Sequence, residues 1–419
     1  MSDDRQDAAT SDPAAALPYT GLRVIEFTHM VMGPTCGMIL ADLGAEVIKV
    51  EPLAGDNTRK LIGSGAGFFP MFNRNKRSLA VDVKDPRGRE IVLKLVAGAD
   101  VFSENFKSGT MDKLGLGCAG LARLNPRLVL VSHRGFLPGP YEHRTALDEV
   151  VQMMGGLAYM TGPEGRPLRA GASVNDIMGG MFGAIGVMAA LAQREKTGRG
   201  QQVQSALFEN NVFLVAQHMM QFAVTGQPAA PMPSRISAWA VYDVFTVKGG
   251  EQVFLAVVSD TQWALFCDEF AGADLKADPR LRTNNERVHA RDWMLPLLRE
   301  RLAVFSAAEL SARFEKIGLP YAPITRPQDL FDDPHLIATG GLAPVTLPDG
   351  RGTAMPLLPV TFGGARLPVR RNPPRLGEDT DALLQSLGYG ATEIDALRAA
   401  GVIGSGAGAQ ATAGRPANA

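Results

Sequence analysis

In the first part of the chain, short apolar runs alternate with stretches of helical periodicity. Residues 22–27 and 47–51 are apolar enough for buried strands. Residues 34–43, between them, form a helical pattern with proline in its first turn, ending at Gly44. Strand, helix and strand at this spacing make a βαβ unit, in which the two strands run parallel. The pattern therefore predicts an α/β fold.

The same alternation continues over the next 170 or so residues, a length typical of one domain. Each predicted strand is short and rich in β-branched or apolar residues, and each predicted helix has an apolar face. We therefore expect an open, Rossmann-like parallel sheet with flanking helices. Further strands are predicted at residues 78–83, 101–104, 128–133 and 202–205, and helices at 86–97, 177–191 and 207–222.

Composition changes at residues 226–233, which are rich in glycine, proline and alanine, as linkers are. Residues 242–247 and 253–258 then predict a β-hairpin, joined by a turn that contains Gly249 and Gly250. Helical patterns follow at residues 261–270, 290–305 and 307–317, so the segment indicates a smaller α+β domain. The predicted organisation is a large domain at 17–230 completed by 335–400, a small domain at 235–330, and disordered tails at 1–16 and 404–419.

Charge and cysteine content narrow the possible environments. The 42 Lys and Arg residues nearly balance the 43 Asp and Glu residues, for a net charge of −1, so no overall field attracts nucleic acid or an anionic membrane. The three cysteines lie far apart, without metal-ligand spacing, which fits a reducing compartment. With no signal-peptide pattern and no uninterrupted apolar run of about 18 residues, we expect a cytoplasmic protein.

Asp176 is the only charged residue between Arg169 and Arg194, and it directly precedes the apolar helix predicted at 177–191. Aspartate is a preferred N-cap residue, so we expect Asp176 to cap that helix. A carboxylate next to an apolar helix also loses hydration and needs a partner or a task. Asp176 is therefore a candidate nucleophile as well as a cap.

A basic run precedes the strand predicted at 78–83. Arg74, Lys76 and Arg77 place three cations within four residues. Such a run is often a solvated loop. It can equally form an edge that binds phosphate, because guanidinium forks and ammonium groups match phosphate oxygens. The sequence leaves both interpretations open.

Several familiar motifs do not apply. Gly115, Gly117 and Gly120 fit G-x-G-x-x-G, but no apolar strand precedes them, so we expect no dinucleotide site there. No nucleophile elbow, P-loop or zinc-protease helix is present in the sequence. The candidate bases, each expected to be structural for want of a partner in sequence, are His29, His133 and His143.

Taken together, these segments closely resemble the class III CoA-transferases, the formyl-CoA transferase type. The resemblance runs over roughly residues 18–400 and implies a large Rossmann-like domain, a smaller domain, and a homodimer whose two chains interlace as linked rings. The matching segments, in order, lie at residues 22–34, 42–51, 73–78, 104–115, 139–148 and 171–201.

The resemblance also implies a chemistry. Asp176 would attack an acyl-CoA thioester and form a mixed anhydride, which is then converted to an aspartyl-CoA thioester. A free carboxylic acid would finally take up the CoA and leave as the new acyl-CoA. Coenzyme A is then a substrate, and no permanent cofactor or metal is expected. Gly249 and Gly250 would form a glycine loop over the catalytic site. The implied contacts with CoA are Arg74, Lys76, Arg77, Asn105, Phe106 and Lys107.

Two departures from the family pattern bear on the reaction. Val31 stands where formyl-CoA transferases have glutamine, which disfavours an oxalate and formate exchange. Leu147 stands where the related α-methylacyl-CoA racemases have their histidine base, which disfavours racemase or epimerase activity. We expect a small dicarboxylate acceptor and succinyl-CoA as donor; a non-catalytic CoA-binding protein is the other alternative. The candidate partners for the acceptor's second carboxylate are Arg144, Arg169 and Arg235.

Overall fold

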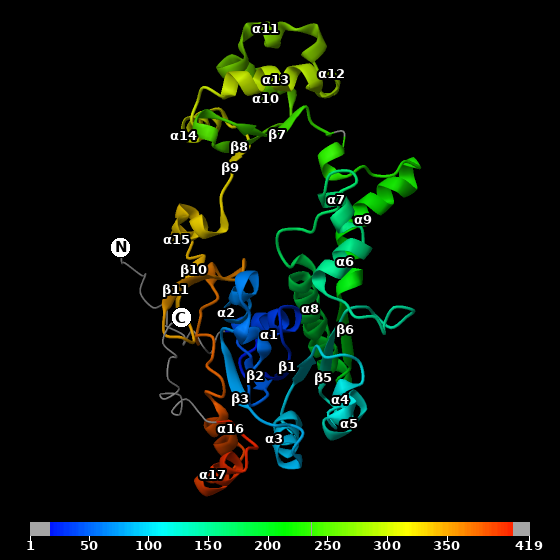
Figure 1. The fold of residues 1–419 in the computed structure, drawn as a ribbon, viewed down its shortest axis with the longest axis vertical. Coiled ribbons are helices and arrows are strands. Elements are labelled where there is room, and N and C mark those ends of the chain that lie inside the picture. The colour runs from blue at the N-terminus through cyan, green and yellow to red at the C-terminus, as the bar shows by residue number, and fades with distance from the viewer. Residues whose placement is uncertain (1–16, 236, 405–419) are drawn as a thin grey trace, which may run out of the picture. The chain divides into compact units, whose positions relative to one another are not determined.

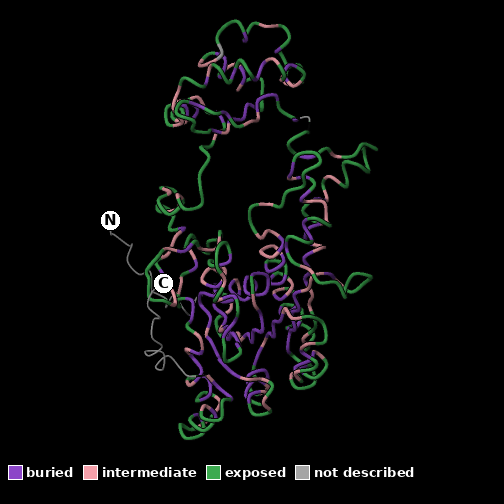
Figure 2. The backbone as a smooth tube through the Cα atoms, in the orientation of Figure 1, coloured by how far each residue is buried: buried purple, intermediate pink, exposed green. Residues whose placement is uncertain are grey.

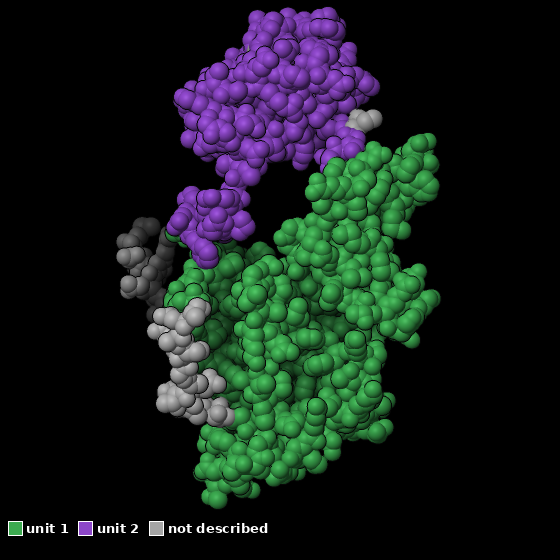
Figure 3. All heavy atoms as spheres, in the orientation of Figure 1, with its two compact units in different colours: residues 1–231, 337–419 green, residues 232–336 purple. Residues whose placement is uncertain are grey.

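The computed structural model describes residues 17–235 and 237–404. The tails predicted at 1–16 and 404–419 lie outside the described residues, apart from Gly404, which donates its backbone N–H to Ala80. Contacts divide the chain into two compact units, residues 1–231 with 337–419 and residues 232–336 (Figure 3). The sequence had predicted these boundaries at 230–235 and 330–335.

The first unit contains a sheet of six strands in the order β3-β2-β1-β4-β5-β6, and every pairing is parallel (Figure 1). This confirms the predicted Rossmann-like fold. The order reverses between β1 and β4, and open α/β sheets bind their ligands beyond the carboxyl ends of the strands at such a point. The strands are β1 (Arg23–Phe27), β2 (Glu46–Glu51), β3 (Lys76–Ala80), β4 (Val101–Glu104), β5 (Val129–Arg134) and β6 (Gln202–Ala206).

Helices cover both faces of this sheet because alternate strand residues are apolar on each side. Ile25 and Ile48 pack against helices of one face, and Val24 and Val47 against those of the other. Figure 2 shows the buried positions concentrated along the strands. The first face carries α3 (Pro86–Ala97), α5 (Cys118–Leu124), α16 (Thr380–Ser386) and α17 (Ala391–Ala399), and the second carries α1 (Met32–Asp42) and α8 (Val174–Thr197).

Helix α8 is longer than the predicted 177–191 and ends only where Gly198 adopts a φ of 72°. By length and composition alone it could cross a membrane. It packs, however, against α1, β5 and β6, so part of its apolar surface belongs to the core of the first unit. The other helices of this part are α2 (Phe68–Phe72), α4 (Thr110–Lys113), α6 (Asp148–Met154), α7 (Leu157–Thr161) and α9 (Leu207–Thr225).

The segment after residue 337 returns to the first unit. Its strands form two small antiparallel pairs, β10 (Leu342–Thr346) with β11 (Gly352–Pro356) and β12 (Thr361–Phe362) with β13 (Ala365–Arg366). Near its end, Val402 accepts the backbone N–H of Asp82. The C-terminal segment therefore completes the core beneath β3.

The second unit contains the predicted hairpin, β7 (Val241–Thr246) with β8 (Gln252–Val257). The sequence did not predict β9 (Tyr321–Pro323), which pairs with β8 and is three residues long with a proline. The helix expected at 261–270 divides after Phe266 into α10 and a π-helical turn. The helices are α10 (Asp260–Phe266), α11 (Gly272–Ala277), α12 (Asn284–His289), α13 (Arg291–Leu302) and α14 (Ala307–Ile317), and α15 (Pro334–Ala338) spans the boundary.

Candidate active site

Asp176 is the third residue of α8, and its side chain is half-buried. The helix begins at Val174, preceded by Ser173, whose side chain makes no capping hydrogen bond. The prediction that Asp176 is the N-cap is therefore wrong. The apolar run used to locate the helix start misses the first turn, which contains two polar residues.

The capping role belongs to Asp148, the buried first residue of α6. Its Oδ2 accepts the backbone N–H of Asn175 at 2.8 Å and that of Asp176 at 3.1 Å. Gln152 donates its side-chain amide to the other oxygen. An interhelical carboxylate thus satisfies two of the N–H groups that an isolated helix start leaves free. The side chain of Asp176 is left available for chemistry.

The surroundings of Asp176 disfavour the charged form of its carboxyl group. Burial raises the pKa of its carboxyl group from 3.8 to about 7, the charge of Asp148 adds to the rise, and the charge of Arg169 opposes it. Arg169 lies 3.8 Å from Asp148 (Nη2 to Oδ1) and 3.5 Å from the exposed Glu149. A carboxylate in such surroundings is poorly solvated and hence a stronger nucleophile once ionised.

Small residues bring α8 close to its neighbours. A Cβ atom on Gly179 would lie 2.4 Å from Cε of Met32, and one on Gly180 would lie 2.5 Å from the carbonyl oxygen of Met32. A Cβ atom on Gly183 would lie 2.6 Å from the ring of His133. The glycines therefore allow the start of α8, with Asp176, to lie directly against the start of α1.

The loops after β1 and β4 meet at the point where the strand order reverses. Asn105 accepts the backbone N–H of His29 at 3.1 Å, donates to its carbonyl oxygen at 2.8 Å, and lies 2.8 Å from its Nδ1. Phe106 stacks on the same ring, with centroids 5.4 Å apart. His29 is thus a partner of two predicted CoA contacts, a relation that the sequence did not reveal.

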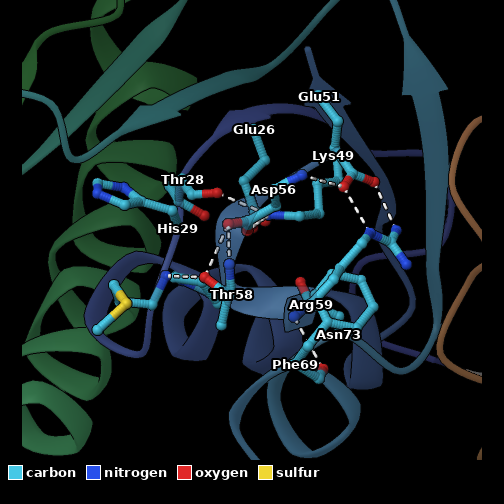
Figure 4. Close-up of polar contacts among 12 residues, drawn as sticks. Glu26, Thr28, His29, Lys49, Glu51, Asp56, Thr58, Arg59, Phe69 and Asn73 are labelled. Carbon is cyan, nitrogen blue, oxygen red and sulfur yellow. Dashed lines mark hydrogen bonds and ion pairs between the residues drawn. The ribbon is translucent and has the colours of Figure 1, made fainter. Parts of the chain in front are cut away.

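A buried ion-pair network supports the loop after β1 (Figure 4). Lys49 donates to the carbonyl oxygen of Thr28 at 2.6 Å and pairs with Asp56 at 2.9 Å. Asp56 binds Thr58, whose Oγ1 accepts the backbone N–H of Met30 at 2.9 Å. Met30 has a φ of 63°, unusual for a residue other than glycine. These bonds hold the strained segment that leads into α1.

A cavity of about 410 Å³ lies beyond the carboxyl ends of β4 and β5. Its wall includes the consecutive residues Asn105, Phe106 and Lys107, which are three of the predicted CoA contacts. It also includes Arg144, whose guanidinium lies over the ring of Tyr141 at 4.3 Å. The lining continues to Ala146, close in sequence to Asp148. Its size is within the range of about 300–1,000 Å³ typical of ligand pockets.

Two of the three cations of the basic run, Arg74 and Lys76, do not form an exposed phosphate-binding edge. Arg74 is buried and pairs with Asp42 at 2.6 Å, and Lys76 is buried and pairs with Glu26 at 2.8 Å. A buried cation that already has a carboxylate partner cannot reach a phosphate in solvent without leaving that partner unpaired. The contacts of these two side chains thus argue against the predicted role.

Arg77, the third cation of that run, pairs with Glu46 at 2.6 Å and with Asp379 at 3.2 Å. It is partly exposed, but it lies at the start of β3. That position is at the amino edge of the parallel sheet, opposite to the cavity beyond β4 and β5. We therefore do not assign Arg77 to the CoA site.

Gly249 and Gly250 form the turn between β7 and β8 in the second unit. Their φ angles are 77° and 80°, which glycine adopts without strain. The hairpin turn is a sufficient structural reason for both residues. Their predicted place over the catalytic site stays a prediction.

The structure also places the other residues that the sequence analysis named. His133 is buried, and burial lowers its pKa to about 3. His143 lines the cavity near Arg144. Leu147 directly precedes α6, and its side chain is exposed. Within residues 17–235 and 237–404, no cluster of three His, Cys, Asp or Glu residues is arranged to hold a metal ion.

Known proteins match this chain over most of its length. A profile of CoA-transferase family III matches residues 19–380. A succinyl-CoA:glutarate CoA-transferase of Mus musculus is 33% identical over 401 residues, which cover 94% of this chain and 92% of the mouse protein. An acetyl-CoA:oxalate CoA-transferase of Acetobacter aceti is 35% identical over 374 residues, covering 87% of this chain and 95% of that protein.

A solved structure agrees with the sequence relatives. The crystal structure of a CAIB/BAIF family protein from Brucella suis is 35% identical, with a TM-score of 0.80, and the match covers 88% of this chain and 99% of that chain. These matches confirm the resemblance, and they extend across both units. The chain therefore belongs to CoA-transferase family III, whose members are transferases that act on coenzyme A thioesters.

Proposed function

We propose that this chain transfers coenzyme A from an acyl-CoA donor to a small free carboxylate, with Asp176 as the nucleophile. The observation that carries the proposal is the half-buried Asp176 carboxyl group, whose pKa is raised to about 7 and whose helix start is capped by another carboxylate. A group with a strongly shifted pKa and no structural task of its own is a candidate catalytic residue.

The proposed reaction balances without a proton donor. An Asp176 oxygen attacks the thioester carbon, the C–S bond breaks, and CoA leaves as the thiolate. The thiolate then attacks the aspartyl carbon of the mixed anhydride, releasing the donor acid and forming an aspartyl-CoA thioester. The acceptor carboxylate attacks the aspartyl carbon of that thioester, the C–S bond breaks, and a second mixed anhydride forms. The expelled thiolate then attacks the acceptor's acyl carbon, which releases the new acyl-CoA and the Asp176 carboxylate. Overall, one CoA thioester is broken and one CoA thioester is formed, so neither ATP nor a permanent cofactor is required.

The cavity beyond β4 and β5 is the proposed binding place for CoA. Asn105, Phe106 and Lys107 line it together with Arg144. The exposed Lys107 and Arg144 offer positive charge for phosphates, and Phe106 offers an aromatic face. This assignment keeps three of the predicted CoA contacts and replaces the basic run by residues with exposed side chains.

For the acceptor we propose a small dicarboxylate, with succinyl-CoA as the donor. The mouse relative is named for succinyl-CoA and glutarate. Of the three predicted arginine partners, only Arg169 acts on the pKa of Asp176. Arg235 belongs to the second unit and donates to the carbonyl oxygen of Met232. Arg169 is thus the candidate that binds the acceptor's second carboxylate.

We further propose that the chain forms a homodimer in the cytoplasm. The supporting observation is an exposed apolar surface on α8 and α9 that includes Phe182 and Phe213, whose rings lie 5.6 Å apart. Monomeric soluble proteins rarely expose large contiguous apolar patches. Light scattering should give twice the mass of one chain; a single-chain mass would contradict the dimer. Further exposed members of this surface are Met181, Ile185 and Met220.

The transfer mechanism is tested by intact mass analysis after incubation with succinyl-CoA. We expect a wild-type adduct equal to CoA minus water. Asp176→Asn should form no adduct, and Asp395→Asn, at an exposed aspartate of α17, should behave as wild type. If the Asp176→Asn variant turns over normally, the nucleophile is another group. Deuterium uptake at the α-carbon in D₂O would support racemase activity in place of transfer.

A further inference from the structure

A second cavity, of about 490 Å³, opens at the amino edge of the sheet. Arg23 is the first residue of β1, Glu46 is the first residue of β2, and Arg77 is the second residue of β3. All three line the cavity, together with Arg370 and Arg371 of the returning C-terminal segment. Because the strands are parallel, this edge is opposite to the one that carries Asn105 and the proposed CoA cavity.

Positive charge exceeds negative charge in this cavity. Glu46 is shared by Arg23 at 2.7 Å and Arg77 at 2.6 Å. Asp379 is shared by Arg77 at 3.2 Å and Arg371 at 2.6 Å. Arg23, Arg77 and Arg371 thus share two carboxylates. Arg370 lines the same cavity, and its guanidinium donates to the carbonyl oxygen of Ala41. The four arginines therefore exceed these two carboxylates by two positive charges.

Two neighbouring carboxylates also act on cavity residues: Asp42 attracts the guanidinium of Arg370, and Asp100 accepts the backbone N–H of Arg23. They do not remove the surplus, because each is already paired with an arginine outside the cavity. Asp42 pairs with Arg74 at 2.6 Å, and Asp100 pairs with Arg194 at 3.0 Å. Within the described part of the chain, neither terminal nitrogen of the Arg23 guanidinium has a hydrogen-bond acceptor. The two terminal nitrogens of the Arg23 guanidinium therefore remain available to donate hydrogen bonds to a ligand.

The arginine segment is held in place by a residue with an unusual backbone. Asn75 has a φ of 62°, and its Oδ1 accepts the backbone N–H groups of Arg370 at 2.6 Å and Arg371 at 2.9 Å. Its own N–H donates to the carbonyl oxygen of Arg371 at 3.0 Å. A strained residue that persists because its surroundings fix it often marks a functional position. The two arginines are therefore pre-positioned over the edge of the sheet.

We propose that this cavity binds a small diphosphate anion, at a place separate from the CoA cavity. Guanidinium forks match phosphate oxygens in pairs, and the two phosphates of a diphosphate supply at least the two negative charges that the surplus calls for. Among the described residues that line the cavity none is aromatic, so no base-stacking surface is offered. The ligand class is thus inorganic pyrophosphate or a small diphosphate ester, without a need for a nucleobase.

The test is calorimetric titration of the full chain with inorganic pyrophosphate, with and without saturating CoA. We expect saturable binding of one pyrophosphate per chain that CoA leaves unchanged. Arg371→Gln should weaken binding about tenfold, since a lost charge-assisted pair is worth roughly one decade. Asp379 would keep its bonds to Arg77 and the backbone of Ser78, so this variant should fold.

Arg23→Gln, from another strand, should weaken binding by a similar factor. Arg123→Gln, at an exposed arginine of α5 outside the cavity, removes the same charge and should leave binding unchanged. Several results would overturn the proposal: no saturable binding by wild type, displacement by CoA, or equal weakening in all three variants. Thermal unfolding of each variant, with and without pyrophosphate, checks folding and reports the same binding through stabilisation. None of these readouts depends on transferase activity.

Discussion

Replacing Asp148 by asparagine should shift the pH dependence of catalysis while leaving the site in place. Asp148 accepts the backbone N–H groups of Asn175 at 2.8 Å and Asp176 at 3.1 Å. An asparagine side-chain oxygen can accept the same two backbone bonds, so the change removes one negative charge and keeps the cap. It gives up only the bond that Gln152 donates to the other oxygen, because an asparagine NH2 group cannot accept it. Because burial first and the Asp148 charge second raise the pKa of Asp176, removing that charge lowers it.

The size of the shift follows from the geometry. Since Asp148 Oδ2 lies 3.1 Å from the backbone nitrogen of Asp176, the two carboxylates are roughly 5–7 Å apart by standard bond lengths. Two unit charges at that separation interact by about 2–3 kcal/mol at an effective dielectric constant near 20. Arg169, 3.8 Å from Asp148, offsets part of this repulsion. A net effect of about 1–2 kcal/mol corresponds to about one pH unit.

The assay is kcat/KM for CoA transfer from about pH 5 to about pH 9, which reports ionisations of the free enzyme. Asp176 must be ionised to attack, so wild-type activity should fall, with the slope of one proton, as pH decreases through about 7. In Asp148→Asn, the same fall in kcat/KM should occur about one pH unit lower. Glu149→Gln, a matched change at the adjacent exposed carboxylate, should not move it. If kcat/KM of Asp148→Asn falls at the same pH as in the wild type, or at a higher pH, the electrostatic argument is refuted.

Two further predictions concern packing and stability. Asp176→Asn should stabilise the fold at pH 8 by roughly 2–4 kcal/mol, because the pKa raised from 3.8 to about 7 disfavours the ionised folded form. The gain in unfolding free energy should vanish near pH 4, where the carboxyl group is protonated. Urea unfolding at pH 8 and pH 4 measures it, and an equal gain at both pH values would contradict the prediction. Gly180→Ala should destabilise by about 1–3 kcal/mol and reduce turnover, since its Cβ would lie 2.5 Å from the Met32 carbonyl and 2.5 Å from Cβ of Thr35. Gly120→Ala, with open space around it in α5, is the control in the same unfolding assay and should be neutral or stabilising.

Local signals determined those elements whose ends carry their own chemistry. The predicted range 86–97 matches α3 because Asp85 caps the helix, proline opens it and Gly98 follows it. The range 307–317 matches α14 because Ser306 and Glu309 form a capping box. By contrast, β9 carries no such signal and is a strand only because β8 pairs with it. Its three residues alone contain too little pattern.

Whether a charged residue is buried or exposed depended on partners that are distant in the sequence. Three clustered cations look alike in the sequence, but two are buried because Asp42 and Glu26 lie beside Arg74 and Lys76 in the fold. Asp148 was the missed member of the site. It precedes Asp176 by 28 residues, and no local pattern connects a carboxylate at the start of α6 to the N–H groups of α8.

The sequence by itself determined the parallel sheet, the family resemblance and Asp176 as the candidate nucleophile. The sheet and the candidate nucleophile follow from periodicity, from turn residues and from one charge isolated beside an apolar helix, all of which are local properties. The resemblance follows from six matching segments in their order along the chain. Only the tertiary structure decided which carboxylate caps α8, which cations are buried, and where an arginine-lined cavity opens. Burial and charge pairing depend on distances between segments that fold together, and those distances set the pKa of Asp176.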